Sequence, residues 1–220
     1  MYGLFITFEG PDGAGKTTQI TLLAQALGRR GLPVRLTREP GGTAAGEAVR
    51  KILLDPAHCL TPEAEALLYM AARAQHVAEV IRPALSRGEI VLSDRYSDST
   101  LIYQGAARRL DRAALMAINQ FATGSLVPDL TVVLDCPPEV LRERRRRRGV
   151  DDRLENESEA FHAMVRRGFL DLAEKEPGRV RLVRGDGSPD LVHAAVLQVI
   201  DEFFAECMRS HGGGGQHEDQ

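Results

Sequence analysis

The sequence predicts an α/β fold in which helices cover a parallel five-stranded sheet. Short apolar runs typical of strands alternate with helical patterns along the chain, which is the order of a parallel sheet with crossover helices. The run from 130 to 135 is almost continuously apolar, as expected for a parallel strand buried on both faces. Because 220 residues suffice for one sizeable core, we expect a single domain over residues 1–209.

The first strand and helix enclose a glycine-rich loop. Residues 4–8 are apolar and β-rich, and apolar residues from Ile20 to Leu27 recur on one helix face. The loop between them fits the pattern G-x-x-x-x-G-K-[ST], whose glycines let successive backbone N–H groups reach phosphate oxygens. Lys16 would neutralise the β- and γ-phosphates of ATP, and the Thr17 hydroxyl would be a ligand of Mg²⁺. A chance glycine turn is the alternative. The expected ATP-binding residues are Gly10, Pro11, Asp12, Gly13, Ala14, Gly15, Lys16, Thr17 and Thr18.

A second strand is expected at 34–37, and a charged loop follows it. Ligands of an open α/β sheet sit beyond the carboxyl ends of its strands, so this loop is placed to contact one. An ordinary strand-to-helix turn with solvated charges is the alternative on local grounds. The next helix, expected over 44–54, carries Arg50, which is either a surface residue or an anion ligand. The loop supplies three candidate substrate-binding residues, Arg38, Glu39 and Pro40.

Another helix is expected to begin after Thr61, with Pro62 at its first position and acidic residues in its first turn. Tyr69 and Arg73 lie four residues apart on it, one turn apart on one face. Such a pair can grip a planar ligand by stacking and hydrogen bonding. A core aromatic beside a surface arginine is the more common meaning, and local evidence alone favours it.

The apolar strand expected at 90–94 ends in Asp94. A carboxylate at this end of a strand, beside a phosphate-binding loop, is placed to hold Mg²⁺ or its waters. A polar stretch with helix-capping residues follows, and it offers the few convergent polar groups that a pocket needs. Its candidate substrate-binding residues are Arg95, Ser99, Thr100, Tyr103 and Gln104.

Two structural assignments follow in the chain. Leu115, Ile118 and Phe121 predict an amphipathic helix that Gly124 ends. Asp135 lies just before Pro137 and Pro138, and we expect it to cap the following helix rather than to act in catalysis.

Residues 142–155 contain an arginine run. Like charges this close repel one another and weaken a closed helix unless an anion neutralises them. A polyphosphate would do so, and the functional interpretation is a mobile lid, about 142–153, whose arginines stabilise charge on the transferring group. The alternative is a solvated basic face that touches RNA. It describes most of these arginines individually, because only two or three can reach one nucleotide.

The last part of the chain completes the α/β pattern. Apolar residues stripe a helix over 161–172, a short strand is expected at 180–183, and a closing helix at 191–208. From 210 to 220 the chain is polar and glycine-rich, and we expect a disordered tail.

The composition of the chain limits the kinds of binding partner and the cellular compartment to be expected. The formal net charge of −3 gives no reason to expect a nucleic-acid polymer or an anionic membrane as the main partner. No apolar run approaches the roughly 20 residues that a membrane-spanning helix needs. The three cysteines are widely separated and form no C-x-x-C pair, which indicates a reducing cytoplasm and neither a disulfide framework nor a zinc site.

Together, these parts predict a kinase for a small acceptor. The chain has a phosphate cradle, a pair of metal ligands and an arginine-rich lid, and the inserted segment at about 38–75 is placed to hold the acceptor. A protein kinase is excluded, because that class uses a different glycine loop and an H-R-D catalytic loop that this chain lacks.

These residues resemble the thymidylate kinase family, in particular its bacterial members. The resemblance implies a P-loop fold of the nucleoside monophosphate kinase type with a lid. It also implies the reaction of ATP with dTMP to give ADP and dTDP for dTTP synthesis, dependence on Mg²⁺, and a homodimer. The resemblance is carried by Phe8 to Thr18, Thr37 to Thr43, Asp94-Arg95-Tyr96, Ser99-Thr100 with Tyr103-Gln104-Gly105, and Asp152-Arg153-Leu154-Glu155.

The resemblance also implies how dTMP is bound. Tyr69 would stack on the thymine, where the family usually has Phe, and Arg73 would hydrogen-bond the base edge together with the pair at 99 and 100. Arg38 and Arg95 would hold the phosphate, with Arg50 as a less certain helper. The side chains at 103 and 104 would press on the sugar and base, where the tyrosine disfavours a ribose 2′-OH.

With the acidic Asp12, the loop resembles that of the family's subgroup in which the lid supplies the catalytic arginine. Asp12 itself would contact the sugar 3′-OH or the metal shell. The leading candidates for the catalytic arginine are Arg148 and Arg153, with Arg144 and Arg146 behind them. The unbroken arginine run departs from the family's usual alternation of arginine with small residues. Lys16 and Arg95 complete the expected catalytic set.

Two other functions stay open at this stage. One is a kinase of another nucleoside monophosphate, such as UMP or AMP, against which the polar cluster at 99–104 argues. The other is a nucleotide-dependent switch or adaptor. A GTPase switch would want an N-K-x-D motif, yet Asn119 and Asn156 are followed by Gln and Glu.

Overall fold

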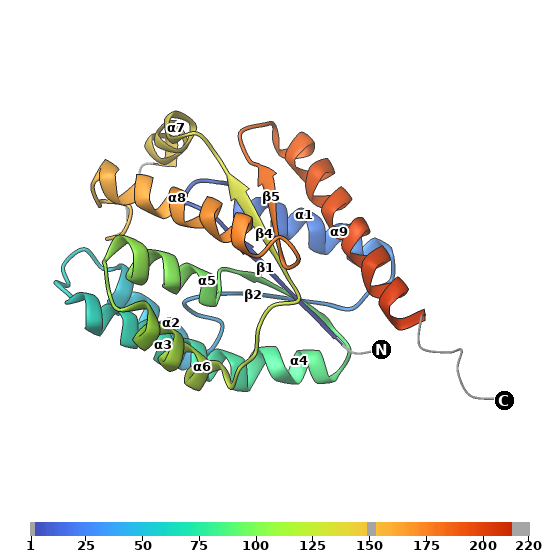
Figure 1. Ribbon diagram of the computed structural model, residues 1–220, viewed down its shortest axis with the longest axis horizontal. Coiled ribbons are helices and arrows are strands. Elements are labelled where there is room, and N and C mark those ends of the chain that lie inside the picture. The colour runs from blue at the N-terminus through green and yellow to red at the C-terminus, as the bar shows by residue number, and fades with distance from the viewer. Residues whose placement is uncertain (1–2, 149–152, 213–220) are drawn as a thin grey trace.

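The computed structural model describes residues 3–148 and 153–212, without the side chains of residues 148 and 210–212. Its centre is a sheet of five strands that all run parallel, in the order β2-β3-β1-β4-β5. The predicted parallel α/β architecture is therefore confirmed, with helices on both faces of the sheet (Figure 1). The strands are β1 (Leu4–Glu9), β2 (Val34–Arg38), β3 (Ile90–Asp94), β4 (Leu130–Asp135) and β5 (Val180–Arg184).

The helices connect these strands in the expected order. Several begin with side-chain caps, as where the hydroxyls of Thr43 and Thr61 accept from the backbone three residues on. The helical segments, with η for a π-helical turn, are α1 (Lys16–Arg29), α2 (Ala44–Leu54), α3 (Pro62–His76), η1 (Val77–Ile81), α4 (Arg82–Ser86), α5 (Ser97–Thr100), η2 (Leu101–Ala107), α6 (Arg112–Thr123), α7 (Pro138–Arg148), α8 (Glu159–Lys175) and α9 (Pro189–Gly212).

The core lies on both faces of the sheet, because successive strand side chains point to opposite faces. On β1, Ile6 packs in the cluster that α1 and α9 cover. Its neighbour Phe5 points the other way and packs with η1 and α4. At the β4–β5 end of that second face, η2 and α8 pack over Val133 and Val180. The sheet is thus buried on both sides, as the continuous apolar runs predict.

The carboxyl ends of the strands meet at one edge, since all five run in one direction. The register pairs Phe8 with Asp94 and Arg38 with Asp94, so the ends of β1, β2 and β3 lie next to one another. This edge brings together the glycine loop, the charged loop and the polar stretch that are far apart in sequence.

Two helices include residues of the predicted lid and tail. α7 continues through the first part of the arginine run to Arg148, where Glu143 forms ion pairs with Arg146 and Arg147. The helix α9 continues to Gly212, past the boundary predicted at residue 209, while 213–220 lie outside the described residues.

Two side-chain assignments also change. On α6, Leu115 is buried but Phe121 is 90% exposed, so the predicted apolar stripe faces outward at its far end. Asp135 is structural as expected, yet it pairs with Arg166 on α8 at 2.6 Å instead of capping α7.

Candidate functional site

The glycine loop adopts the backbone that its pattern predicts. Gly10, Gly13 and Gly15 all have positive φ, and a Cβ on Gly10 would lie 2.4 Å from the Leu134 carbonyl oxygen, so glycine is required there. Lys16 is 6% exposed, and its Nζ donates to the carbonyl oxygens of Gly10 and Pro11 at 3.1 and 3.0 Å. The loop and the amino-terminal end of α1 thus form a cradle for anionic oxygens.

A large cleft of about 1030 Å³ opens over this loop. Loop residues from Asp12 to Thr18 form its floor. Arg38 and Glu47 line it on one side, and the loop around Gly185 lines it on the other. The volume and the loop at its floor suit a nucleoside triphosphate.

The two predicted metal ligands meet in this cleft. The Thr17 hydroxyl donates to Asp94 Oδ2 at 2.6 Å, and both residues line the cleft. A hydroxyl and a carboxylate are hard oxygen donors, so the pair fits Mg²⁺ on adjoining phosphates. Among the described residues no group of three or more His, Cys, Asp or Glu is clustered to hold a metal by itself.

A second, smaller cavity of about 80 Å³ adjoins the cleft. It brings together all the predicted substrate-binding residues except Arg38, which lines the cleft instead and pairs with Glu47. Of the residues that the structure describes, four line both spaces: Asp12, Glu39, Arg50 and Arg95.

Arg95 is the centre of the wall between the two cavities. Its Nη2 donates to Asp12 Oδ1 at 2.6 Å and to the Tyr103 hydroxyl at 3.0 Å, and its Nη1 donates to Ser99 Oγ at 2.9 Å. The Tyr103 hydroxyl in turn donates to the other oxygen of Asp12. Arg95 has a φ of 71°, a left-handed conformation that is uncommon for a residue with a side chain. The fold therefore holds this guanidinium at the junction at a cost in backbone strain.

The charges around Arg95 shift one another's pKa values. Burial opposes ionisation of Asp12, but the positive charges of Arg95 and Lys16 outweigh it and lower the Asp12 pKa. Burial and the charge of Arg95 both lower the pKa of Lys16, which the nearby carboxylates offset only in part. The Asp12 carboxylate in the loop is thus a negative charge between the cations Lys16 and Arg95.

Glu9, the last residue of β1, lies beneath this network. Its side chain is fully buried and accepts from the backbone N–H of Tyr96 at 2.8 Å and from the Ser99 hydroxyl at 2.5 Å. Burial raises its pKa to about 7, although Arg95 at 3.8 Å acts in the opposite direction. Glu9 is not among the site residues predicted from the sequence. The feature that could have pointed to it is its position as a charged residue at the end of an apolar strand, directly before the glycine loop.

Arg73 is not the surface residue that local evidence favoured. It is 1% exposed and donates to Glu39, Thr100 and Asn119, at 2.7, 3.0 and 3.0 Å. Its partner Tyr69 packs against the cluster under η2, where burial raises the pKa of the phenol. Both line the small cavity, so the ligand-binding interpretation of the pair is the one its surroundings favour.

Arg153 does not lie over the glycine loop. Its guanidinium pairs with the buried Glu65 at 2.5 Å and donates to the Leu53 carbonyl oxygen at 2.9 Å, so it lines neither cavity. Glu65 also accepts from Gln104 at 2.7 Å and pairs with Arg108. This carboxylate, which sequence analysis missed, draws the arginine toward α3.

Of the lid arginines with described side chains, Arg144 contacts the glycine loop. Its Nη1 donates to the Gly13 carbonyl oxygen at 3.2 Å, and its Nη2 to the Gly185 carbonyl oxygen at 2.9 Å. Arg145 also lines the cleft, whereas Arg146 pairs with Glu143 on the exposed side of α7. The side chain of Arg148 lies outside the described residues. Among the lid arginines whose side chains are described, Arg144 and Arg145 lie at the cleft, while Arg146 and Arg153 pair with carboxylates elsewhere.

The structure also places the charged loop. The peptide bond between Glu39 and Pro40 is cis, and Arg50 donates to the Pro40 carbonyl oxygen at 2.9 Å. Glu39 turns inward and forms hydrogen bonds with both Arg73 and His76.

In the described ranges no helix is long and apolar enough to cross a membrane.

The comparisons with known proteins indicate one family. The thymidylate kinase family model matches residues 8–196. The thymidylate kinase of Pelotomaculum thermopropionicum is 51% identical over 96% of this chain and 99% of its own length. That of Deinococcus radiodurans is 51% identical over 91% of this chain and 97% of its own length. The crystal structure of thymidylate kinase from Ehrlichia chaffeensis has a TM-score of 0.75 and 34% identity, covering 91% of this chain and all of that one. Motifs, fold and relatives therefore agree, and the chain belongs to the thymidylate kinase family.

Proposed function

We propose that the chain transfers the γ-phosphoryl group of ATP to dTMP, giving ADP and dTDP in dTTP synthesis. The observation that carries this proposal is the shared wall of the two cavities, where Asp12 and Arg95 line both. A donor on the glycine loop and an acceptor in the small cavity would meet at this wall. Direct in-line transfer needs that closeness and no covalent intermediate.

On the donor side, the glycine loop and Lys16 bind the phosphates of ATP. The family relationship makes the lid arginines Arg148 and Arg153 candidates for stabilising the transferring group, a contribution of order 10³ to 10⁵ in rate. The contacts of Arg144 with the loop support it as a further donor-side residue. The segment at about 142–153 acts as the lid of a single kinase domain over 1–209.

On the acceptor side, Tyr69 stacks on the thymine while Arg73, Ser99 and Thr100 read the base edge. Tyr103 and Gln104 contact the sugar and base. Arg38, Arg95 and Arg50 bind the phosphate of dTMP, within the loop that Glu39 and Pro40 shape. All of these residues except Arg38, which lines the adjoining cleft, converge around one cavity, and this convergence supports their roles.

Mg²⁺ would be held by Thr17 and Asp94 together with the phosphates. When bound, the ion neutralises charge on the phosphate oxygens. The Thr17 hydroxyl donates to the Asp94 carboxylate at 2.6 Å, so both oxygens are close enough together to serve as ligands of one ion.

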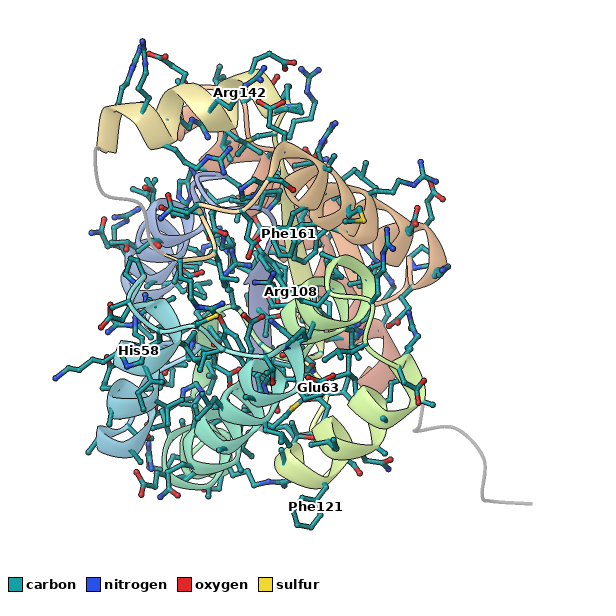
Figure 2. All side chains as sticks on the ribbon, turned by 90° about the vertical axis from the view of Figure 1, so that its left-hand side faces the viewer. His58, Glu63, Arg108, Phe121, Arg142 and Phe161 are labelled. Atoms are coloured by element: carbon teal, nitrogen blue, oxygen red, sulfur yellow. The ribbon has the colours of Figure 1, made fainter. Side chains whose placement is uncertain are left out.

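We further propose a homodimer, in the cytoplasm, with no nucleic-acid polymer or membrane as partner. The exposed apolar side chains of two adjoining helices support the dimer: Leu67 on α3, and Met116, Ile118 and Phe121 on α6. Phe121 points away from the rest of the chain (Figure 2). A patch of this kind is typical of a protein–protein interface.

The proposed reaction is tested by ADP release with ATP and Mg²⁺, supplying dTMP, dUMP, UMP, CMP, AMP and GMP one at a time. Strong preference for dTMP is expected. Preference for another monophosphate would overturn the base-pocket roles while leaving phosphoryl transfer in place. No release with any acceptor would bring the switch or adaptor function forward.

A further inference from the structure

Arg73 has most of its hydrogen-bonding capacity taken up by the protein. A guanidinium has five N–H groups. Its Nε donates to Glu39 Oε2 at 2.7 Å, its Nη1 to Thr100 Oγ1 and Asn119 Oδ1 at 3.0 Å each, and its Nη2 to the Tyr96 carbonyl oxygen at 3.0 Å. Within the described part of the chain this leaves one Nη2 N–H for a molecule in the small cavity. A single N–H donor can distinguish one base from another only if the direction of its N–H bond is fixed.

Glu39 fixes that direction through its second oxygen. Its Oε1 lies 2.9 Å from Nδ1 of His76, whose ring is completely buried. An ionised carboxylate only accepts hydrogen bonds, so Nδ1 carries the proton in this pair. Both oxygens of Glu39 are therefore held from α3, one by Arg73 and one by His76.

The His76 ring is itself fixed on its other side. Its Nε2 is hydrogen-bonded to the Thr37 hydroxyl on β2. A Cβ on Gly42 would lie 2.7 Å from Cδ2 of the ring and 2.8 Å from Nε2, so the charged loop packs directly on the imidazole. The ring can neither turn nor shift without moving β2 or this loop.

We propose that His76 is a specificity-determining positioning residue, which sets the Glu39 carboxylate and through it the one free N–H of Arg73. This inference rests on the proposed function, because it concerns how the acceptor base is read. The free N–H matches a carbonyl oxygen on the base, such as thymine O4, and not the amino group that cytosine carries at that position. His76 contacts neither substrate; its effect passes through two side chains.

The experiment compares His76→Phe with His76→Asn. Phenylalanine keeps a planar ring but has no donor for Glu39, whereas the asparagine amide N–H lies close to the position of Nδ1. For His76→Phe, kcat/KM for dTMP should fall about 10- to 100-fold, the effect of misdirecting a charged hydrogen bond, and the preference for dTMP over dCMP should fall with it. The KM for ATP should stay unchanged. His76→Asn should restore most of the preference.

Controls separate the possible failures. His58→Phe, an exposed histidine on the loop after α2, should leave all constants unchanged. If wild-type protein turns over no monophosphate, the proposed function fails. If wild-type protein turns over dTMP and His76→Phe keeps the wild-type preference, the positioning role fails. It also fails if His76→Phe changes both KM values and kcat equally and His76→Asn does not restore them.

If His76→Phe does not fold, Thr37→Val decides the matter. This variant keeps the side-chain shape and removes only the outer hydrogen bond to Nε2. It should lower the dTMP over dCMP preference by about threefold, the size of one neutral hydrogen bond. An unchanged preference would overturn the proposal.

Discussion

Glu9 makes the stability of the fold depend on pH in a predictable direction. Burial raises its pKa from 4.5 to about 7, so the folded chain binds a proton at pH values where the unfolded chain has released it. The stabilisation from this proton is fully present below the unfolded pKa and is lost as the pH rises through the folded one. From these two pKa values the loss between pH 5 and pH 8.5 is on the order of 2 to 3 kcal/mol.

The variant Glu9→Gln isolates this contribution, because glutamine has nearly the same shape and does not ionise. Urea unfolding of both proteins at pH 5, 6, 7 and 8.5 gives the difference in unfolding free energy at each pH. Other titrating groups are common to both proteins and largely cancel. We expect wild-type protein to lose on the order of 2 to 3 kcal/mol relative to Glu9→Gln as the pH rises. The exposed Glu63 on α3 supplies the matched control, Glu63→Gln (Figure 2).

A difference between wild type and Glu9→Gln that is independent of pH would refute the reasoning. So would the opposite slope, which would mean that the Arg95 charge outweighs burial and holds Glu9 ionised. In that case the carboxylate would be a true ion-pair partner of Arg95 rather than a mostly protonated hydrogen-bonding group.

Four further predictions concern the reaction and the assembly. Lys16→Ala should abolish turnover while circular dichroism and the Tm stay unchanged, and near-normal rates would contradict the phosphate-loop assignment. Arg153→Ala should lower kcat far more than dTMP affinity, with the exposed α7 variant Arg142→Ala as control; equal losses would indicate simple binding. Asp94→Asn should raise the Mg²⁺ concentration for half-maximal rate by about 10- to 100-fold, and an unchanged titration would remove Asp94 from the metal site. Phe121→Glu should shift the sedimentation coefficient from dimer to monomer because a charge enters the exposed apolar patch, whereas a dimer that persists would place the interface elsewhere.

The strands and the glycine loop could be predicted closely from sequence, because their signals are local. A β-rich apolar run, three glycines and a lysine fix the conformation around residues 4–18 whatever the rest of the chain does. The cap and proline at 61 and 62 likewise gave the start of α3 to the residue. The parallel order of the strands then brought the predicted acceptor residues, except Arg38, to one cavity.

The side-chain network behind the site could not be predicted, since it depends on tertiary contacts. Arg73 looks like a surface residue in sequence, and its burial is explained only by Glu39 from the loop after β2 and Thr100 from α5. In the same way, nothing near Arg153 in sequence points to Glu65 as its partner, 88 positions earlier in the chain. The π-helical turn η2 also leaves no local signal, yet it sets the positions of Tyr103 and Gln104.

The most direct test of the central claim is a competition in one vessel. Wild-type protein with ATP and Mg²⁺ receives dTMP, dUMP, dCMP and UMP at equal concentrations, and the diphosphates are separated and quantified early in the reaction. The ratio of products gives the ratio of kcat/KM values without separate rate measurements. We predict that dTDP dominates from the first time point. A different diphosphate in excess, or nucleotide binding without any diphosphate formed, would contradict the account.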